Sequence, residues 1–448
     1  MRVMRGSVLL LAGAGVLVGA QVAGAVGQAV AADGPPPAPA PAVLAPIDVT
    51  SPTGPRPTAE GVRGEVGRLA RRGLFDGSIV VVDPASRTVL LDQGADRPRI
   101  PASVTKLATS TAALTVLGPQ TRLPTIVYRD GDTVYLVGGG DPTLVRAKGG
   151  NPLAGGSASM RDLAEATAAE FTANTSLTVV YDSSAFRGPR LGPGWPTSFP
   201  AAGVVAPVTA LVVDGGRVRP GATSRVADPA KQAGSVFAGF LRGQGLDVTS
   251  VKAGTRSASA TEVARVESPP VADIVGRMLT NSENNYAEAL AHLVGGAMLD
   301  DPSFAGGASA TTLTLETVGI GSDGVTLVDG SGLSGRDRIP VRVLAGILTG
   351  VVRGDDPRLA PIDSGLAVAG LTGTLADRYT TAATQSGRGF VHGKTGTLTG
   401  VVSLAGTVLD AEGRILVFAM IANKVTSLNQ ARETMDVIAS RLATCGCS

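Results

Sequence analysis

The chain has 448 residues, 44% of them hydrophobic and 17% charged, with a formal net charge of +2. This length allows two or three domains, and so small a net charge excludes a strongly basic surface for nucleic acid. Aromatic residues make up only 3% of the chain, which argues against base stacking. Because the chain has only two histidines and two cysteines, we expect no zinc-type metal site, and no cofactor motif is apparent.

The N-terminal segment predicts export. Arg2 and Arg5 precede an uncharged stretch over residues 7–26, and Ala29-Val30-Ala31 fits a cleavage site made of small residues. This pattern is typical of a secretory signal over residues 1–31. The alternative is an uncleaved membrane anchor, since about 20 apolar residues can span a bilayer. In both cases the rest of the chain is expected outside the cytoplasm.

Residues 32–58 are rich in proline and alanine and predict a flexible or polyproline-like linker, after which order should begin near residue 60. Residues 78–83 and 88–92 then predict a strand and its hairpin partner. The apolar run over residues 103–117 predicts a helix, which ends at Gly118-Pro119.

The pattern changes over residues 121–262, which we interpret as inserted α/β material. Its expected elements are strands at 133–137, 177–182 and 208–213, with helices at 162–171 and 230–241. The flanking residues 59–120 and 263–448 would then form one domain. Its later expected elements are helices at 271–279, 285–294, 341–351 and 430–442, and paired strands at 400–409 and 414–422.

Three short motifs follow one another along the chain: Ser103-x-x-Lys106, Ser282-Glu283-Asn284 and Lys394-Thr395-Gly396-Thr397. Residues three apart on a helix share a face, so the hydroxyl of Ser103 and the amine of Lys106 can reach each other. A serine becomes a good nucleophile when a base accepts its proton, and a lysine is such a base only when burial or a nearby cation lowers its pKa. We expect Lys394 to be that cation, and the helix N-terminus to offer N–H groups to an oxyanion.

Each motif is weak evidence by itself. Ser427-Leu428-Asn429 also fits the second pattern, but it lies after the third motif and is therefore discarded. The three motifs in this order, each in its expected helix, loop or strand context, favour one shared site over three unrelated surface tripeptides.

Four longer stretches extend the pattern beyond the motifs: residues 101–107, 136–144, 329–334 and 393–398. With these stretches, the chain resembles the penicillin-binding protein and serine β-lactamase superfamily from about residue 60 to its end. More narrowly, it resembles the D-alanyl-D-alanine carboxypeptidase/endopeptidase family, the class C low-molecular-mass penicillin-binding proteins. The long interval between Ser103 and Ser282 agrees with the large insertion that this family has between its first two motifs.

The resemblance implies an α+β (mixed α/β) transpeptidase fold of the penicillin-binding/β-lactamase type. Its body would be a five-stranded antiparallel sheet with flanking helices and a helical lobe, formed by residues 59–120 and 263–448. One or more smaller α/β domains would be inserted over residues 121–262.

The resemblance also implies three catalytic residues: Ser103 as the acylated nucleophile, Lys106 as its general base and Ser282 as a proton relay to the leaving amine. The implied substrate-binding residues are Asn284, Lys394, Thr395, Gly396 and Thr397. In the family pattern, Asn284 would hold the peptide carbonyl, Lys394 would tune the electric field, and Thr395 and Thr397 would bind the terminal carboxylate. The backbone N–H groups of Ser103 and Thr397 would form the oxyanion hole.

The sequence departs from the family pattern after residue 334. The family commonly has an asparagine a few residues on, whereas this chain continues as Gly335-Arg336-Asp337-Arg338. We interpret the segment 329–334 as a glycine-rich loop near the site, because it lacks the frame of a second serine nucleophile.

Four further residues have ordinary structural interpretations. We expect Asp141 to lie in a turn, His292 to be a structural helix residue and His392 to line the cleft. Cys445 and Cys447 lie at what we expect to be a frayed end, as a local disulfide, free thiols or an intermolecular link.

Together these features predict an exported serine DD-peptidase that acts on peptidoglycan stem peptides and is acylated by β-lactams at Ser103. Two alternatives stay open: a β-lactamase or secreted esterase on the same scaffold, and a non-catalytic cell-wall binding protein. The sequence leaves open the balance of carboxypeptidase and endopeptidase action, the oligomeric state and a possible N-terminal membrane association.

Overall fold

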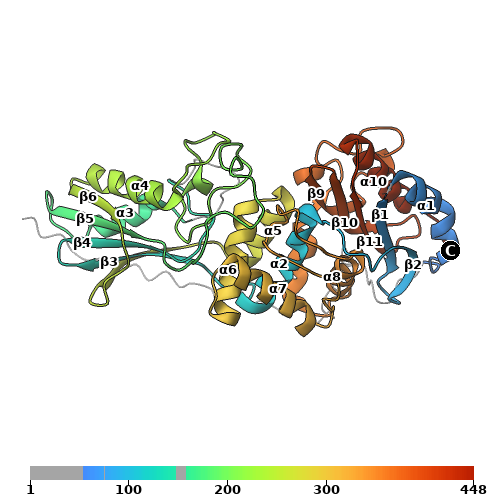
Figure 1. The fold of residues 1–448 in the computed structure, drawn as a ribbon, viewed down its shortest axis with the longest axis horizontal. Helices are drawn as coiled ribbons and strands as arrows, with labels where there is room; N and C mark the ends of the chain where they lie inside the picture. Colours follow the sequence, from blue (N-terminus) through green and yellow to red (C-terminus); the bar gives the residue numbers. More distant parts are fainter. Residues whose placement is uncertain (1–53, 75, 148–157) are drawn as a thin grey trace, which may run out of the picture. The chain divides into compact units, whose positions relative to one another are not determined.

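The computed structural model describes residues 54–74, 76–147 and 158–448 (Figure 1). The expected signal over residues 1–31 and most of the expected linker lie outside the described residues. Among the described helices, none combines the length and the apolar character that a membrane span requires.

The first sheet has six strands in the order β2-β1-β11-β10-β9-β8, and neighbouring strands run antiparallel. Its strands are β1 (Asp76–Asp83), β2 (Thr88–Gln93), β8 (Ala367–Val368), β9 (Val391–Leu398), β10 (Val401–Leu409) and β11 (Ile415–Asn423). The expected hairpins β1–β2 and β10–β11 are present. The resemblance implied five strands; the sixth is β8, a two-residue strand that pairs with β9.

Both faces of this sheet are buried, because alternate side chains of its central strands enter two different cores. On β1, Ile79 and Val81 pack with helices α1 and α10, whereas Val80 and Val82 face the helices on the other side. Helix α1 spans Ala59–Gly73, and helix α10 spans Leu428–Ala443. Ser427, the residue of the discarded motif, caps α10 by accepting a hydrogen bond from the Gln430 backbone.

The helical lobe surrounds one central helical run. The run begins as a short 3-10 helix (η1, Ala102–Thr105), continues as α2 (Lys106–Ala112) and ends as a π-helical turn (η2, Ala113–Leu117). Helices α5 to α8 pack around α2. The remaining bounds are α5 (Val271–Asn281), α6 (Asn284–Leu299), α7 (Phe304–Thr317), α8 (Val341–Arg353) and α9 (Ala360–Gly365).

A second sheet lies between β2 and α5 in the sequence and has its own hydrophobic core. Its order is β6-β5-β4-β3-β7, with strands β3 (Pro124–Asp130), β4 (Thr133–Gly138), β5 (Ser176–Asp182), β6 (Asp247–Ala253) and β7 (Thr261–Glu267). Helices α3 (Met160–Ala168) and α4 (Pro229–Gly243) pack on it. The strand expected at residues 208–213 is wrong. That segment is buried but forms no ladder, and instead the carbonyl of Ala210 accepts a hydrogen bond from the Gly140 backbone at 2.9 Å.

The C-terminus is packed, so the expectation of a frayed end is also wrong. Cys445 and Cys447 are 1% and 2% exposed and are paired as a disulfide. The carbonyl of Cys447 accepts a hydrogen bond from the Thr58 backbone at 2.7 Å, at the start of α1. The last residues of the chain therefore pack in the layer that α1 and α10 form.

Candidate active site

Ser103 and Lys106 come from the start of the central helical run. Lys106 is fully buried, and its Nζ lies 3.0 Å from Ser103 Oγ. The same Nζ also donates to Asn284 Oδ1 at 2.8 Å and to the carbonyl of Ser331 at 2.8 Å. An ammonium has three donors, so these contacts account for all of them.

Burial is the main reason that the pKa of Lys106 falls to about 8. The negative charges of Glu288, Asp329 and Glu283 oppose this shift. The result is a lysine that changes its charge close to neutral pH, as a general base requires.

The second motif occupies the turn between two helices. Ser282 ends α5 in a left-handed conformation with φ of 60°, and Asn284 begins α6. This sharp turn places both side chains at the start of α6, where Asn284 Oδ1 meets Lys106. The Asn284 amide nitrogen donates to the carbonyl of Val204 at 2.8 Å, which leaves one of its two N–H groups for another acceptor.

The third motif lies on β9 and supplies the opposite wall. Lys394 Nζ donates to Ser282 Oγ at 2.9 Å and to the carbonyl of Thr395 at 2.7 Å. Thr395 Oγ1 donates to Thr374 Oγ1 at 2.9 Å, and Thr397 Oγ1 accepts from Arg432 at 3.2 Å. The structure thus brings the three motifs together at one site.

Gly396 sets the distance between this wall and the nucleophile. A Cβ atom at this position would lie 2.9 Å from the Ser103 backbone nitrogen and 3.0 Å from the carbonyl of Pro101. Because real Cβ atoms do not approach that closely, a side chain here would force β9 away from Ser103. Glycine allows the close approach.

Lys394 is fully buried and has a pKa well below its ordinary value, mainly because of burial and secondly because of the charge of Lys106. Burial is the main cause of the lowered pKa of Lys106, and the expectation that Lys394 is the cation that lowers it stays a prediction.

Sequence reasoning missed the side chains that hold the backbone before Ser103. Asn423 at the end of β11 accepts from the Ile100 backbone N–H at 2.9 Å and donates to the Ile100 carbonyl at 3.0 Å. Ser403 on β10 donates to the Pro101 carbonyl at 2.6 Å. Ala102 itself has φ of 52°, an unfavourable value for alanine that these contacts help to maintain. The sequence signal that could have identified Ser403 and Asn423 is a polar residue within, or at the end of, an otherwise apolar strand.

Glu288 was also missed, although it is fully buried on α6, one turn after Asn284. Its two oxygens accept hydrogen bonds from the backbone of Gly330 at 3.0 Å and of Ser331 at 2.8 Å. Since the carbonyl of Ser331 contacts Lys106, Glu288 positions the loop that holds the lysine. A lone glutamate within an apolar helix was the signal in the sequence.

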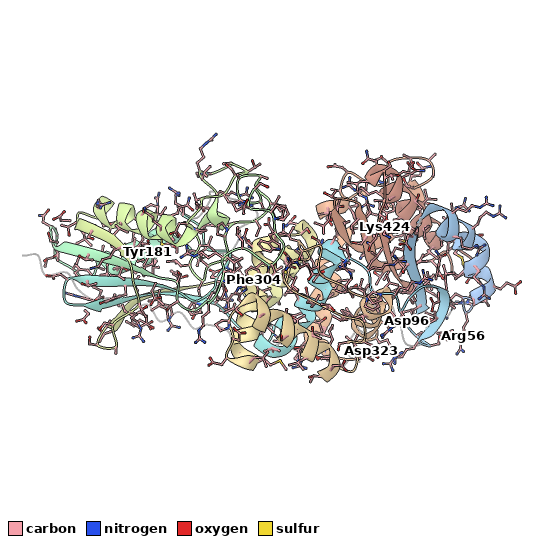
Figure 2. The ribbon with its side chains drawn as sticks, in the orientation of Figure 1. Arg56, Asp96, Tyr181, Phe304, Asp323 and Lys424 are labelled. Atoms are coloured by element: carbon pink, nitrogen blue, oxygen red, sulfur yellow. A yellow bond between two sulfur atoms is a disulfide. The ribbon has the colours of Figure 1, made fainter. Side chains whose placement is uncertain are left out.

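The predicted glycine-rich loop lies beside the site and is fixed by Asp329. This carboxylate accepts from Trp195 Nε1 at 2.7 Å and from the backbone of Gly332 and Ser334, both at 2.7 Å. Trp195 packs edge-on against Phe304 at the start of α7, which is labelled in Figure 2. Two residues of the segment before residue 208 therefore contact the site: Trp195 contacts the glycine-rich loop, and Val204 contacts Asn284.

The remaining candidates do not contact Ser103 or Lys106. His292 is buried between Phe186 and Phe304, and its Nδ1 lies 2.8 Å from the Glu288 carbonyl. Asp141 accepts from the backbone and the hydroxyl of Thr143, as in a turn. Within residues 54–74, 76–147 and 158–448, no cluster of three or more His, Cys, Asp or Glu side chains could hold a metal ion.

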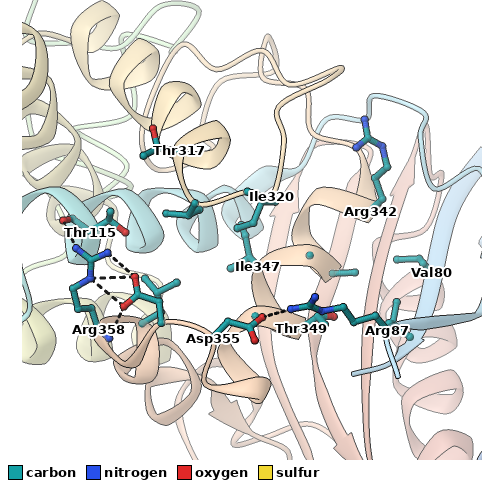
Figure 3. Close-up of a pocket in the computed structure, with 18 of the residues that line it drawn as sticks. Val80, Arg87, Thr115, Thr317, Ile320, Arg342, Ile347, Thr349, Asp355 and Arg358 are labelled. Atoms are coloured by element: carbon teal, nitrogen blue, oxygen red, sulfur yellow. Dashed lines mark hydrogen bonds and ion pairs between the residues drawn. The ribbon is translucent and has the colours of Figure 1, made fainter. Parts of the chain in front are cut away.

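A cavity of about 960 Å³ lies away from the three motifs (Figure 3). It lies among β1, β2, the end of α7 and α8, and none of the predicted site residues lines it. Its arginines have carboxylate partners, such as Arg87 with Asp355 at 2.7 Å and Arg358 with Asp356 at 2.7 Å. The motif residues therefore define the candidate site, and this cavity does not.

Comparison with known proteins agrees with this assembly of motifs. Residues 73–225 and 219–445 match the sequence model of the D-Ala-D-Ala carboxypeptidase 3 (S13) family. A carboxypeptidase of Mycolicibacterium smegmatis is 36% identical over 93% of this chain and 91% of its own. A carboxypeptidase of Mycobacterium tuberculosis is 35% identical over 94% of this chain and 91% of its own.

The chain belongs to the S13 family. This S13 enzyme is accordingly a hydrolase of the DD-carboxypeptidase type. Among solved structures, penicillin-binding protein 4 of Haemophilus influenzae matches with a TM-score of 0.70 at 19% identity, over 85% of this chain and 98% of that one. A predatory endopeptidase of Bdellovibrio bacteriovorus matches with a TM-score of 0.53 at 15% identity, over 81% of this chain and 90% of that one. These two likenesses show the shared fold.

Proposed function

We propose that this S13 enzyme cleaves D-alanyl peptide bonds of peptidoglycan stem peptides through an acyl-enzyme on Ser103. The observation that supports this most directly is the set of contacts around Lys106 Nζ. A neutral amine has two N–H groups and one lone pair. Asn284 Oδ1 and the Ser331 carbonyl can only accept, so they take the two N–H groups. The lone pair then faces the remaining neighbour, Ser103 Oγ, at 3.0 Å.

In the first step, Ser103 Oγ attacks the carbonyl carbon of the penultimate D-alanine while its proton passes to Lys106. Backbone N–H groups at Ser103 and Thr397 stabilise the oxyanion of the tetrahedral intermediate. The C–N bond then breaks, and the proton held by Lys106 passes through Ser282 to the leaving amine. The product is an ester on Ser103 and a free terminal amino acid.

In the second step, water attacks the ester and gives a proton to Lys106, which returns a proton to the Ser103 oxygen as the ester C–O bond breaks. An amine that replaces the water would give a new peptide bond, so some transpeptidation follows from the same intermediate. Substrate binding involves the free N–H group of Asn284, which holds the peptide carbonyl, and the hydroxyls of Thr395 and Thr397, which bind the terminal carboxylate.

The names of related proteins support both the substrate and the inhibitor. The Mycolicibacterium and Mycobacterium relatives are carboxypeptidases, and the Bdellovibrio neighbour is a peptidoglycan endopeptidase. The Haemophilus protein has been solved in complex with a β-lactam, and the Bdellovibrio protein in a form acylated by penicillin G. For this chain we propose carboxypeptidase action, endopeptidase action or both, and covalent inhibition by β-lactams.

The location and the domain division belong to the same proposal. Peptidoglycan lies outside the cytoplasm, and the N-terminal pattern of the sequence fits export. We assign residues 59–120 and 263–448 to the catalytic domain, and residues 121–262 to the insertion.

The test is the intact mass of the protein after exposure to benzylpenicillin, together with the release of D-alanine from an acyl-D-Ala-D-Ala peptide. We expect one penicilloyl adduct on the wild type and on Ser364→Ala, and none on Ser103→Ala. Ser364 is an exposed serine outside the site and serves as the matched control. Rapid turnover of penicillin without release of D-alanine would favour a β-lactamase. A wild type that neither acquires the adduct nor releases D-alanine would favour a binding protein.

A further inference from the structure

A groove of about 650 Å³ adjoins the third motif on the side of helix α10. Thr395 and Thr397 of β9 line it together with Thr374. Arg378 and Arg432 also line it, as do the acids Asp377, Glu433 and Asp436. The groove therefore joins the hydroxyls that are proposed to bind a carboxylate with two guanidinium groups.

The cations near these hydroxyls differ in how far they are already engaged. Arg378 forms two hydrogen bonds with the carboxylate of Asp436, at 3.0 and 2.6 Å. Lys394 Nζ is buried and directed at Ser282 and the Thr395 carbonyl. Neither group is free to bind a new anion in the groove.

Arg432 is different because its partners are neutral. One guanidinium nitrogen donates to Thr397 Oγ1 at 3.2 Å, and another lies 3.4 Å from Asn429 Oδ1. Within the part of the chain that the structure describes, no carboxylate forms an ion pair with it. Its side chain is half-buried on the groove side of α10, where a loose surface arginine would instead extend into water.

A carboxylate that is bound by hydroxyls alone loses its hydration without gaining a counter-charge, which is costly. A guanidinium supplies two parallel N–H donors that match the two oxygens of a carboxylate. Arg432 already reaches the hydroxyl of Thr397, so a carboxylate at that hydroxyl would lie next to the guanidinium.

We propose that Arg432 is a specificity-determining residue that binds the α-carboxylate of the C-terminal residue of the substrate, beside Thr397. This inference rests on the proposed function. It restricts efficient cleavage to substrates whose leaving residue has a free carboxylate next to the scissile bond. A peptide with an amide at that position would offer no negative charge to Arg432 and would be a poor substrate.

The experiment compares two substrates, an acyl-D-Ala-D-Ala peptide and the same peptide with a C-terminal amide. We measure kcat and KM for the wild type, Arg432→Gln, Arg432→Lys and Arg441→Gln. Arg441 lies on the same helix, exposed and outside the groove, and is the matched control.

A hydrogen bond to a charged group has an effect of about 10- to 100-fold. We therefore expect Arg432→Gln to lose about 10- to 100-fold in kcat/KM on the free acid, mainly through KM, and little on the amide. Arg432→Lys should recover part of the loss, and Arg441→Gln should behave as the wild type.

Two outcomes would overturn the inference: equal losses on both substrates, which would indicate a structural role, or no loss on the free acid. Failure of the proposed function looks different. In that case the wild type itself would cleave neither peptide, and benzylpenicillin would not label Ser103.

Discussion

The two walls of the cleft each present a buried lysine, yet they surround it differently. On the helical wall, Lys106 has the acids Glu288 and Asp329 nearby, and they partly offset the cost of burying its charge. On the strand wall, Lys394 has only neutral acceptors, the Ser282 hydroxyl and the Thr395 carbonyl. Burial is the first cause that lowers both pKa values, and it brings the pKa of Lys106 to about 8.

The difference shows how one cleft can hold two lysines without two full charges. Like charges close together in a buried site cannot both persist, so one group gives up its proton first. The charges of Glu288 and Asp329 raise the pKa of Lys106 and so oppose the loss of its proton. The placement of Glu288 and Asp329 thus helps Lys106 to keep its proton close to neutral pH.

The largest expected effect comes from removing the base itself. In Lys106→Met the hydroxyl of Ser103 has no partner to accept its proton, and general bases contribute about 10²- to 10⁴-fold to rate. We expect acylation by benzylpenicillin, followed by stopped-flow or intact mass, to slow by that factor while the melting temperature shows a folded protein. Acylation within about threefold of the wild-type rate would exclude Lys106 as the base.

The next effect concerns the pH dependence of acylation. The active form of Lys106 is neutral, so the wild-type rate should rise with pH and level off above about 8. The negative charge of ionised Glu288 raises the pKa of Lys106, and burial raises the pKa of Glu288 itself to about 8, so the two groups titrate in the same pH range. In Glu288→Gln that charge is absent, so the pKa falls and the midpoint of the profile moves to lower pH.

The control for this shift is Glu65→Gln. Glu65 is an exposed acid on α1 and is not one of the site residues. Its profile should coincide with that of the wild type. A Glu288→Gln profile with a lower plateau but the same midpoint would indicate that Glu288 acts only by holding the backbone of Gly330 and Ser331.

A smaller effect is expected on the strand wall, where Asn423 connects β11 to the backbone before Ser103. Asn423→Ala leaves the N–H and carbonyl of Ile100 without these partners. Such a loss costs about 1–3 kcal/mol of the free energy of unfolding. The acylation rate should fall as well, because Ala102 is less firmly held. Unfolding in urea and the rate of penicillin labelling measure the two effects, and a variant changed in neither would show that this connection is dispensable.

Sequence reasoning predicted the parts of this molecule whose patterns are local. The strands β1, β10 and β11 and the helices α5 and α8 are apolar runs of ordinary length, and the structure contains them. Helix α7 was missed because its glycines and threonines are poor helix formers, and packing against α2 and α6 compensates for them.

The candidate site shows the same limit. The three motifs are short and local, so they could be found, and the structure brings them together. Glu288, Ser403 and Asn423 lie 42 to 323 residues from the backbone groups that they bind, and no spacing rule connects them. The contacts between the segment 204–206 and Asn284 or Asn285 likewise depend on the tertiary fold.

The smallest expected effect on activity tests the acids of the helical wall. Asp337 is fully buried, and its Oδ1 accepts from the Val328 backbone at 2.8 Å. Burial, and next the charge of Asp329, raise its pKa to about 10 from an ordinary 3.8. The folded protein therefore holds a neutral carboxyl group at position 337, where the family commonly has an asparagine nearby.

The sign of the pH effect follows from where the proton is bound. Between about pH 4 and pH 10 the folded state keeps a proton on Asp337 that the unfolded state has lost, so this group makes stability fall as pH rises. Asparagine cannot ionise, so Asp337→Asn should melt above the wild type by a margin that grows from pH 5 to pH 9, with acylation little changed. Thermal melts at pH 5, 7 and 9 give the margin. If it stays constant across these pH values, Asp337 is ionised in the folded protein, and Lys106 has a further negative charge on its side of the cleft.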